Sequence, residues 1–115
     1  RRSLAPGLIQ NFRLNIAFKA RSFHAYHLGK VFGVSPAGDI EARQCVAGLL
    51  YGPRGRHGLR LGEETPGDFF ACKGVVEAVL ELFHLRDAAL WERRERAWLH
   101  PGKSVDVSYR DARLG

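Results

Sequence analysis

The sequence predicts an α+β domain in which an antiparallel β-sheet is flanked by helices. Apolar residues recur at spacings of three and four near the N-terminus and again after residue 68, which is typical of amphipathic helices. Between these segments, and after residue 103, apolar and other residues alternate as in half-buried strands. The connections are too short for crossovers, which favours antiparallel pairing. At 115 residues the chain can bury a core, so we expect one domain over residues 1–115.

The clearest helical pattern covers residues 68–83. Residues 65–67 (Thr-Pro-Gly) interrupt the chain before it, and the Asp68 carboxylate can accept hydrogen bonds from N–H groups of the first turn. One apolar stripe is predicted to face the core, and it consists of Phe69, Cys72, Val76, Val79, Leu80 and Phe83.

Three residues on this helix carry further expectations. Lys73 and Glu77 are four residues apart, so their side chains can form an ion pair on another face. Gly74 is unusual, because glycine in a helix interior costs about 1 kcal/mol relative to alanine. We therefore expect a neighbouring element to pack too closely against this turn to admit a Cβ atom.

A first helix is predicted near the N-terminus. Ser3 can cap it, and Pro6 is tolerated in its first turn. Its apolar surface combines a stripe at spacings of four with three additional residues: Leu4, Leu8, Phe12 and Ile16, then Ile9, Ala17 and Phe18. We expect this helix to dock on the sheet, and burial within the domain is favoured over contact with a partner chain.

Two long strands should follow, over residues 23–34 and 41–52, joined by a turn at residues 36–39 (Pro-Ala-Gly-Asp). The first strand has large residues on one face (Tyr26, Leu28, Phe32 and Val34) and mostly smaller ones on the other (Ala25, His27, Gly29, Val31 and Gly33). Gly29 and Gly33 would allow a ligand or another backbone to approach closely, although strand glycines more often mark bends or tight packing.

The C-terminal part predicts a further strand over residues 104–109, in which Ser104, Asp106 and Ser108 alternate with Val105, Val107 and Tyr109. Residues 110–112 should turn toward another short strand. The charged run 92–96 is interpreted as a solvated strand or edge.

Residues 53–67 are rich in glycine, arginine and proline and have no period, so we expect a mobile loop. A basic, glycine-rich loop can cradle phosphate. This one lacks the Gly-Lys-Ser/Thr ending of a P-loop, which makes the connecting role the better interpretation.

The chain has a formal charge of +6, which suits nucleic acid, an acidic partner or neither. Its arginines are scattered without the interleaved aromatics that stack bases. The favoured interpretation is therefore a positive charge without a nucleic-acid role. A basic RNA-contacting module that uses Arg54, Arg56 and Arg60 is the alternative function. Cys45 and Cys72 lie in apolar runs and are interpreted as buried free thiols.

No apolar run is long enough to span a membrane and no signal segment opens the sequence, so a cytoplasmic location is expected. The chain contains no methionine and opens on two arginines, from which we expect a piece of a longer chain.

The five histidines do not form a catalytic or metal-binding pattern. His24 and His27 point to opposite strand faces, and His57, His84 and His100 have no carboxylate or thiolate at ligand spacing, which argues against a metal site. Ser104, His100 and Asp106 supply the residue types of a catalytic triad. On one short segment they cannot adopt the geometry of nucleophile, base and orienting group.

Four sequence blocks carry a family resemblance. They are residues 3–8 (Ser-Leu-Ala-Pro-Gly-Leu), 27–32 (His-Leu-Gly-Lys-Val-Phe), 68–74 (Asp-Phe-Phe-Ala-Cys-Lys-Gly) and 99–104 (Leu-His-Pro-Gly-Lys-Ser). In this order they resemble Ser-Leu-Leu-Pro-Gly-Leu, Glu-Ile-Gly-Arg-Val-Phe, Asp-Phe-Phe-x-x-Lys-Gly and Leu-His-Pro-Gly-Arg-Ser of the catalytic-like domain of bacterial phenylalanine–tRNA ligase β subunits. His27, Cys72 and Lys103 depart from the family pattern, which affects surface pairings and not the assignment.

The resemblance implies a class II aminoacyl-tRNA synthetase-like sheet and a non-catalytic structural domain that packs against the ligase α subunit in an α2β2 heterotetramer. The parent enzyme would use ATP and magnesium and would bind tRNA, whereas this chain is expected to hold no catalytic, cofactor-binding or metal-binding residue and to be inactive alone.

A comparison with the related catalytic α subunit supports that expectation. Where its strand resembles Gly-Arg-Val-Tyr-Arg, with a last arginine on the ATP α-phosphate, this chain has Gly33 in place of that arginine. Where it resembles Gln-Val-Glu-Gly, with Gln and Glu on the substrate ammonium, this chain has Cys45 and Ala47. The resemblance therefore implies that these contacts are lost.

Overall fold

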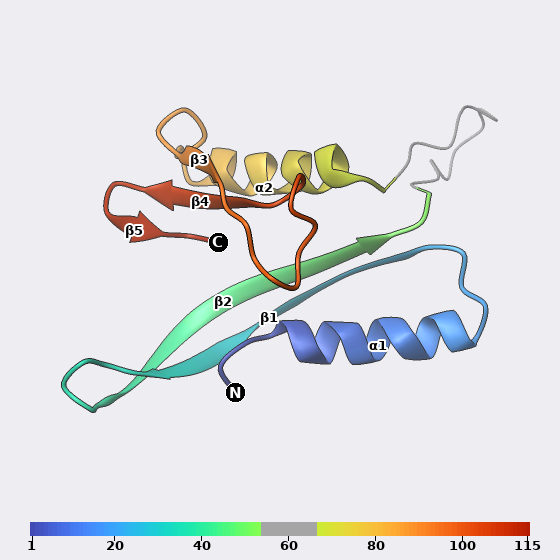
Figure 1. Cartoon of the computed structure of the whole chain (residues 1–115), viewed down its shortest axis with the longest axis horizontal. Helices are drawn as coiled ribbons and strands as arrows, with labels where there is room; N and C mark the ends of the chain where they lie inside the picture. Colours follow the sequence, from blue (N-terminus) through green and yellow to red (C-terminus); the bar gives the residue numbers. More distant parts are fainter. Residues whose placement is uncertain (54–66) are drawn as a thin grey trace. The chain divides into compact units, whose positions relative to one another are not determined.

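The computed structural model describes residues 1–53 and 67–115 (Figure 1). It divides into two compact units, Arg1–Asp68 and Phe69–Gly115, each of which contains one helix and an antiparallel sheet. The α+β prediction with antiparallel strands is confirmed. The single domain over residues 1–115 stays a prediction. The loop expected over residues 53–67 lies, apart from its two ends, outside the described residues.

The first unit consists of helix α1 (Ala5–Ala17) and a long hairpin of β1 (Phe23–Val34) and β2 (Ile40–Tyr51). The strands pair antiparallel along their whole length, from Phe23 opposite Tyr51 to Val34 opposite Ile40, as expected. At the turn, the Ser35 N–H donates to the carbonyl of Asp39 at 2.8 Å, and Gly38 adopts a φ of 92°. A glycine suits this left-handed position because it has no Cβ.

Helix α1 packs on the face of the hairpin that carries the smaller β1 residues. Leu4 and Leu8 are buried, as is Val31 on β1. The Phe12 ring meets the rings of Phe23 and Tyr51 edge-on, with centroids 5.8 and 5.0 Å apart. Docking of the first helix on the sheet is therefore confirmed, and aromatic contacts at the open end of the hairpin fix its position.

The start of α1 differs slightly from expectation. Its N-cap residue is Leu4, which makes no side-chain hydrogen bond, whereas the Ser3 Oγ accepts the N–H of Ala5 at 3.1 Å. Pro6 lies in the first turn as predicted. Gly29 faces the same region, because a Cβ added there would meet the side chains of Arg1 and Leu4. The glycine thus serves close packing, the structural alternative considered for it.

The opposite face of the hairpin carries exposed apolar side chains, namely Tyr26, Leu28, Phe32 and Val34 of β1 with Ile40 and Val46 of β2. These residues alternate with those under α1, as the period of two requires.

The second unit consists of helix α2 (Phe69–Leu82) and a three-stranded sheet of β3 (Leu90–Arg93), β4 (Val105–Tyr109) and β5 (Ala112–Arg113), in the order β3-β4-β5 (Figure 1). Both pairings are antiparallel. The two C-terminal strands agree with prediction, whereas only the start of the charged run 92–96 is strand and the rest is loop.

The apolar stripe predicted for α2 is only partly correct. Leu80 is buried and Phe69 and Val76 are half-buried, but Cys72, Val79 and Phe83 are exposed, while Ala71 is buried. The predicted ion pair is present, with Lys73 Nζ 3.3 Å from Glu77 Oε1, and the same Nζ lies 5.4 Å from the centroid of the Trp91 ring. The helix is therefore turned so that Lys73 and its neighbours face β3, and the outer part of the stripe stays at the surface.

Two expectations about close packing, one for Gly74 and one for the two cysteines, are wrong. Gly74 is exposed, and a Cβ added to it would meet no atom within 4 Å, so no element among residues 1–53 and 67–115 packs closely against this turn. Cys72 is an exposed free thiol and Cys45 is half-buried, so neither is the buried cysteine that its apolar neighbours indicated. On α2, the positions of Cys72 and Gly74 are exposed in the described residues, whereas Cys45 lies on the face of β2 that α1 partly covers. No helix in the described ranges is long and apolar enough to cross a membrane.

Candidate functional site

The most concentrated group of charged side chains in the described residues surrounds Asp106, in the middle of β4. Trp91 and Val107 are opposite each other in the β3–β4 register, and the Trp91 ring contacts Lys73 of α2. Because side chains alternate along a strand, Asp106 lies on the face of β4 opposite to Val107. Its side chain is 12% exposed.

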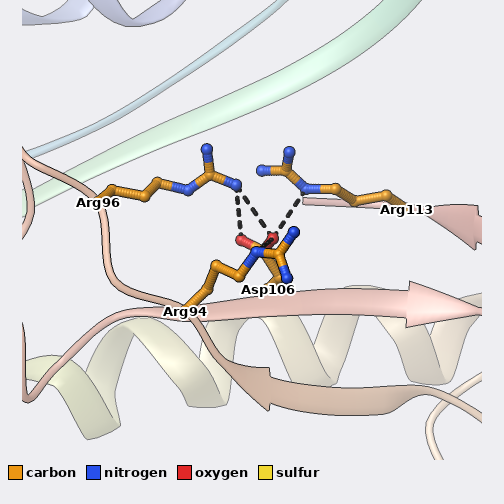
Figure 2. A network of polar contacts seen from close by, with 4 residues as sticks. All are labelled: Arg94, Arg96, Asp106 and Arg113. Carbon is orange, nitrogen blue, oxygen red and sulfur yellow. Dashed lines mark hydrogen bonds and ion pairs between the residues drawn. The ribbon is translucent and has the colours of Figure 1, made fainter.

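Three arginines from two segments converge on this carboxylate (Figure 2). One Nη of Arg96 donates to both carboxylate oxygens, at 2.9 and 3.0 Å. The Nε atoms of Arg113 and Arg94 lie 3.3 and 3.7 Å from Oδ2. Arg113 belongs to β5, and Arg94 and Arg96 follow β3. The carboxylate thus joins the last strand and the 94–104 loop to the middle strand. We refer to Arg94, Arg96, Arg113 and Asp106 as the Asp106 cluster.

Electrostatics within the Asp106 cluster favour the ionised carboxylate. The hydrogen bond from Arg96 lowers the pKa of Asp106, partial desolvation opposes this effect, and the charges of Arg113, Arg96 and Arg94 lower the pKa further. Three positive groups surround one negative group, so the cluster keeps a positive charge. Arg94 and Arg113 are 65% and 57% exposed, so most of that charge faces solvent.

The loop that carries Arg96 is held by hydrogen bonds to main-chain carbonyls. The Arg94 N–H donates to the carbonyl of Ser104 at 3.1 Å, and an Nη of Arg93 donates to the carbonyl of Pro101 at 3.2 Å. A shallow cavity of about 330 Å³ opens beside it, lined by Glu95, Arg96, Ala97, Leu99 and Pro101. Arg96 thus belongs both to the cluster and to the wall of the cavity.

The residue types of a triad are not connected as one. His100 Nδ1 accepts the N–H of Gly102 at 3.0 Å, and Asp106 interacts with arginines. The Oγ of Ser104 is buried and has no hydrogen-bond partner in the part of the chain that the structure describes. No group of three or more His, Cys, Asp or Glu side chains able to hold a metal ion occurs within residues 1–53 and 67–115.

The three positions compared with the catalytic α subunit share one face of the hairpin. Gly33, Cys45 and Ala47 all belong to the set of side chains on the α1 side, since Cys45 is opposite Gly29 in the register. None of the three offers a charged or amide group. Arg54, Arg56 and Arg60, proposed for RNA contact, lie outside the described residues.

Sequence reasoning missed the Asp106 cluster, because the run 92–96 was interpreted as a solvated edge. The sequence contains one indication of this cluster, which is the charge of Asp106 in the middle of a half-buried strand. Asp106 is the only charged residue of a strand with buried neighbours, and such a carboxylate needs cationic partners. The arginines before and after the strand were the nearest candidates.

The fold and the cluster together define an α+β protein whose main polar feature, within the described residues, is a salt-bridge network on a small antiparallel sheet. Over residues 1–115 the chain matches the family model described as the phenylalanyl tRNA synthetase beta chain CLM domain. The chain belongs to this family, which confirms the resemblance found in the four sequence blocks.

Individual relatives agree. The phenylalanine–tRNA ligase beta subunit of Bacillus subtilis is 32% identical over 120 residues, which cover 100% of this chain and 14% of that protein. The corresponding subunit of Bacillus licheniformis is 32% identical over 117 residues, and that of Oleidesulfovibrio alaskensis is 33% identical over 109 residues, or 93% of this chain. The chain thus spans about 14% of the length of these relatives.

Proposed function

We propose that this chain is a non-catalytic structural domain of a phenylalanine–tRNA ligase β subunit that packs against the α subunit and supports an α2β2 heterotetramer. The observation that carries the proposal is the family match over residues 1–115. In this proposal the sheet is of the class II aminoacyl-tRNA synthetase type and the parent enzyme works in the cytoplasm, where it attaches phenylalanine to tRNA for protein biosynthesis.

Exposed apolar surface supports an assembly role. On α1, Ile9 and Leu14 are 49% and 55% exposed, Phe18 directly after the helix is 86% exposed, and the outer face of the hairpin is apolar as well. The apolar side chains on the outer face of the hairpin share one face of two paired strands, and an apolar patch of this kind is typical of protein interfaces. Either surface can receive the α subunit or other parts of the β subunit.

The site chemistry supports a non-catalytic role. In the proposed parent enzyme, ATP and magnesium serve amino-acid activation, during which negative charge builds on the α-phosphate oxygens. A preorganised donor at such a position is worth about 3 kcal/mol or more in the transition state. Gly33 has no side chain to supply one, and Cys45 and Ala47 cannot hold the substrate ammonium as Gln and Glu do.

The assembly proposal is tested by co-expressing the 115-residue chain with a bacterial phenylalanine–tRNA ligase α subunit and measuring the mass of the purified complex. We expect co-elution. Leu14→Glu on the exposed side of α1 should weaken the complex, and Asn11→Glu, also exposed on α1, is the matched control. Elution of the α subunit without the chain would argue against the proposal.

The non-catalytic part is tested by ATP–pyrophosphate exchange with ATP, magnesium and phenylalanine. We expect no exchange by the chain, and none after Gly33→Arg, because that variant restores one contact and leaves the ammonium contacts missing. Exchange by the unmodified chain would make it an active synthetase core.

A further inference from the structure

We propose that the guanidinium groups of Arg94, Arg96 and Arg113 bind phosphate groups of an RNA backbone. The inference rests on the proposed function, in which the domain belongs to an enzyme that handles tRNA, and it adds a contact site on the second unit. Asp106 is the organising residue of this site, because it holds the three arginines together and is not itself a contact.

The hydrogen-bond geometry leaves donors available. Arg94 and Arg113 reach Asp106 through Nε, and Arg96 does so through one Nη. The remaining Nη atoms of these arginines make no contact in the described interactions. Figure 2 shows the outer Nη groups of Arg96 and Arg113 directed to the same side, away from β4. Paired N–H groups of this kind match the oxygens of a phosphate.

The negative charge of Asp106 also allows the three positively charged side chains to lie close together. Three guanidinium groups repel one another, and a central carboxylate offsets this repulsion while it fixes their orientation. It neutralises only one of three charges. Between residues 93 and 113 the sequence has six cationic and three anionic side chains, so the surroundings of the cluster stay positive as well. The cluster is thus preorganised for an anion, which lowers the entropy lost on binding.

An exposed aromatic residue favours RNA over an acidic protein. Trp98 lies two residues after Arg96 in the same loop and is 75% exposed. Proteins that bind single strands combine cationic side chains on the backbone with aromatic rings on which bases stack, worth about 1–3 kcal/mol per base. An acidic peptide would have no comparable use for the indole ring beyond general apolar contact.

The test compares two double variants of the full chain in binding to unfractionated tRNA at several salt concentrations. Arg94→Gln/Arg113→Gln removes two contacts and keeps the Arg96–Asp106 pair, so the fold should survive. Arg43→Gln/Arg86→Gln removes the same charge from exposed residues elsewhere. We expect the cluster variant to bind about tenfold more weakly at 0.1 M salt and to reduce the slope of log K against log salt by roughly 1 to 2. Equal behaviour of the two variants would overturn the proposal.

A second measurement does not depend on any variant. The Nε–Hε NMR signals of Arg94, Arg96 and Arg113 should shift on addition of tRNA and, more weakly, of inorganic phosphate, whereas that of Arg86 should not. Unchanged cluster signals, or larger shifts with polyglutamate than with tRNA, would refute an RNA site.

Trp98→Ala should weaken tRNA binding without changing the salt slope. The assembly test is independent, because a chain that binds the α subunit but fails these tests loses only this inference.

Discussion

A single Nη of Arg96 donates to both carboxylate oxygens of Asp106, at 2.9 and 3.0 Å, and this pair is the shortest contact of the Asp106 cluster. The two side chains are 28% and 12% exposed, whereas Arg94 and Arg113 are mostly exposed. A salt bridge contributes more when it is shielded from water and has good hydrogen-bond geometry. The Arg96–Asp106 pair should therefore stabilise the loop, and the outer arginines should contribute little to stability.

The first prediction follows from this difference. Arg96→Gln should lower the thermal midpoint clearly more than Arg94→Gln, because it removes the two short hydrogen bonds and leaves a nearly buried carboxylate with weaker partners. Arg94→Gln loses only a contact of 3.7 Å at the surface. Differential scanning calorimetry at neutral pH and moderate salt gives both midpoints. Equal shifts would show that the cluster acts as a diffuse charge and not through one pair.

The second prediction concerns pH. The cluster lowers the pKa of Asp106 in the folded chain relative to the unfolded chain, chiefly through the hydrogen bond from Arg96. The stability gained from the ionised carboxylate is therefore fully present above the unfolded pKa of about 4 and is lost as the pH falls through the lower folded value. Thermal midpoints of wild type and Asp106→Asn should differ at pH 7 and converge at the acidic end. A constant difference at all pH values would contradict this assignment.

Much of the secondary structure could be predicted from the sequence. The limits of β1, Phe23–Val34, agree with the expected residues 23–34. The assignment of its two faces also holds, because a shift by one residue along the strand would exchange the buried and exposed side chains. The short strands were also recognisable. What failed was the assignment of burial on α2, since an apolar stripe indicates a face that can be buried and does not say which part meets a partner within this chain.

The candidate site was less predictable for a different reason. Asp106 and its arginines come together only when β4 pairs with β5 and the 94–104 loop folds back, so the cluster depends on three segments at once. The spacing of Arg94 and Arg96 along the chain does not indicate a common target. For Gly74 the sequence predicted a contact that the structure does not have. A glycine inside a helix indicated close packing, but a Cβ added there would meet no atom within 4 Å.

The third prediction uses that open space. Gly74→Ala should stabilise the chain by about 0.5–1 kcal/mol, because alanine favours helix and the new Cβ meets no atom within 4 Å. Gly52→Ala is the contrasting change. Gly52 has a φ of 77°, and a Cβ there would collide with the carbonyl of Arg21, so this variant should be clearly destabilised. Urea denaturation followed by circular dichroism decides both, and destabilisation by Gly74→Ala would restore the idea of a closely packed neighbour.

The fourth prediction concerns the end of α2. His84 has a φ of 55°, and the Leu85 N–H donates to the carbonyl of Leu80 at 2.8 Å, which is the hydrogen bond of a Schellman motif. A side chain with a Cβ is strained in this conformation, so His84→Gly should stabilise by about 1 kcal/mol. His84→Ala keeps the Cβ and is the control. The prediction fails if the two variants have the same unfolding free energy.

The fifth prediction concerns the docking of α1. Phe12 is half-buried and makes edge contacts with Phe23 and Tyr51, so Phe12→Leu should lose the aromatic contacts at a cost of about 1 kcal/mol, and Phe12→Ala should lose about 2–3 kcal/mol. Phe18, directly after the last residue of α1, is 86% exposed, so Phe18→Ala should stay within about 0.5 kcal/mol of wild type.

Amide hydrogen exchange adds spatial detail to the same variants. Phe12→Ala should speed exchange in α1 and along β1 and β2, because the helix and the hairpin bury their apolar side chains against each other. A larger effect of Phe18→Ala than of Phe12→Ala would mean that α1 docks through its other side. In that case the buried face of the hairpin would have to be covered by something other than α1.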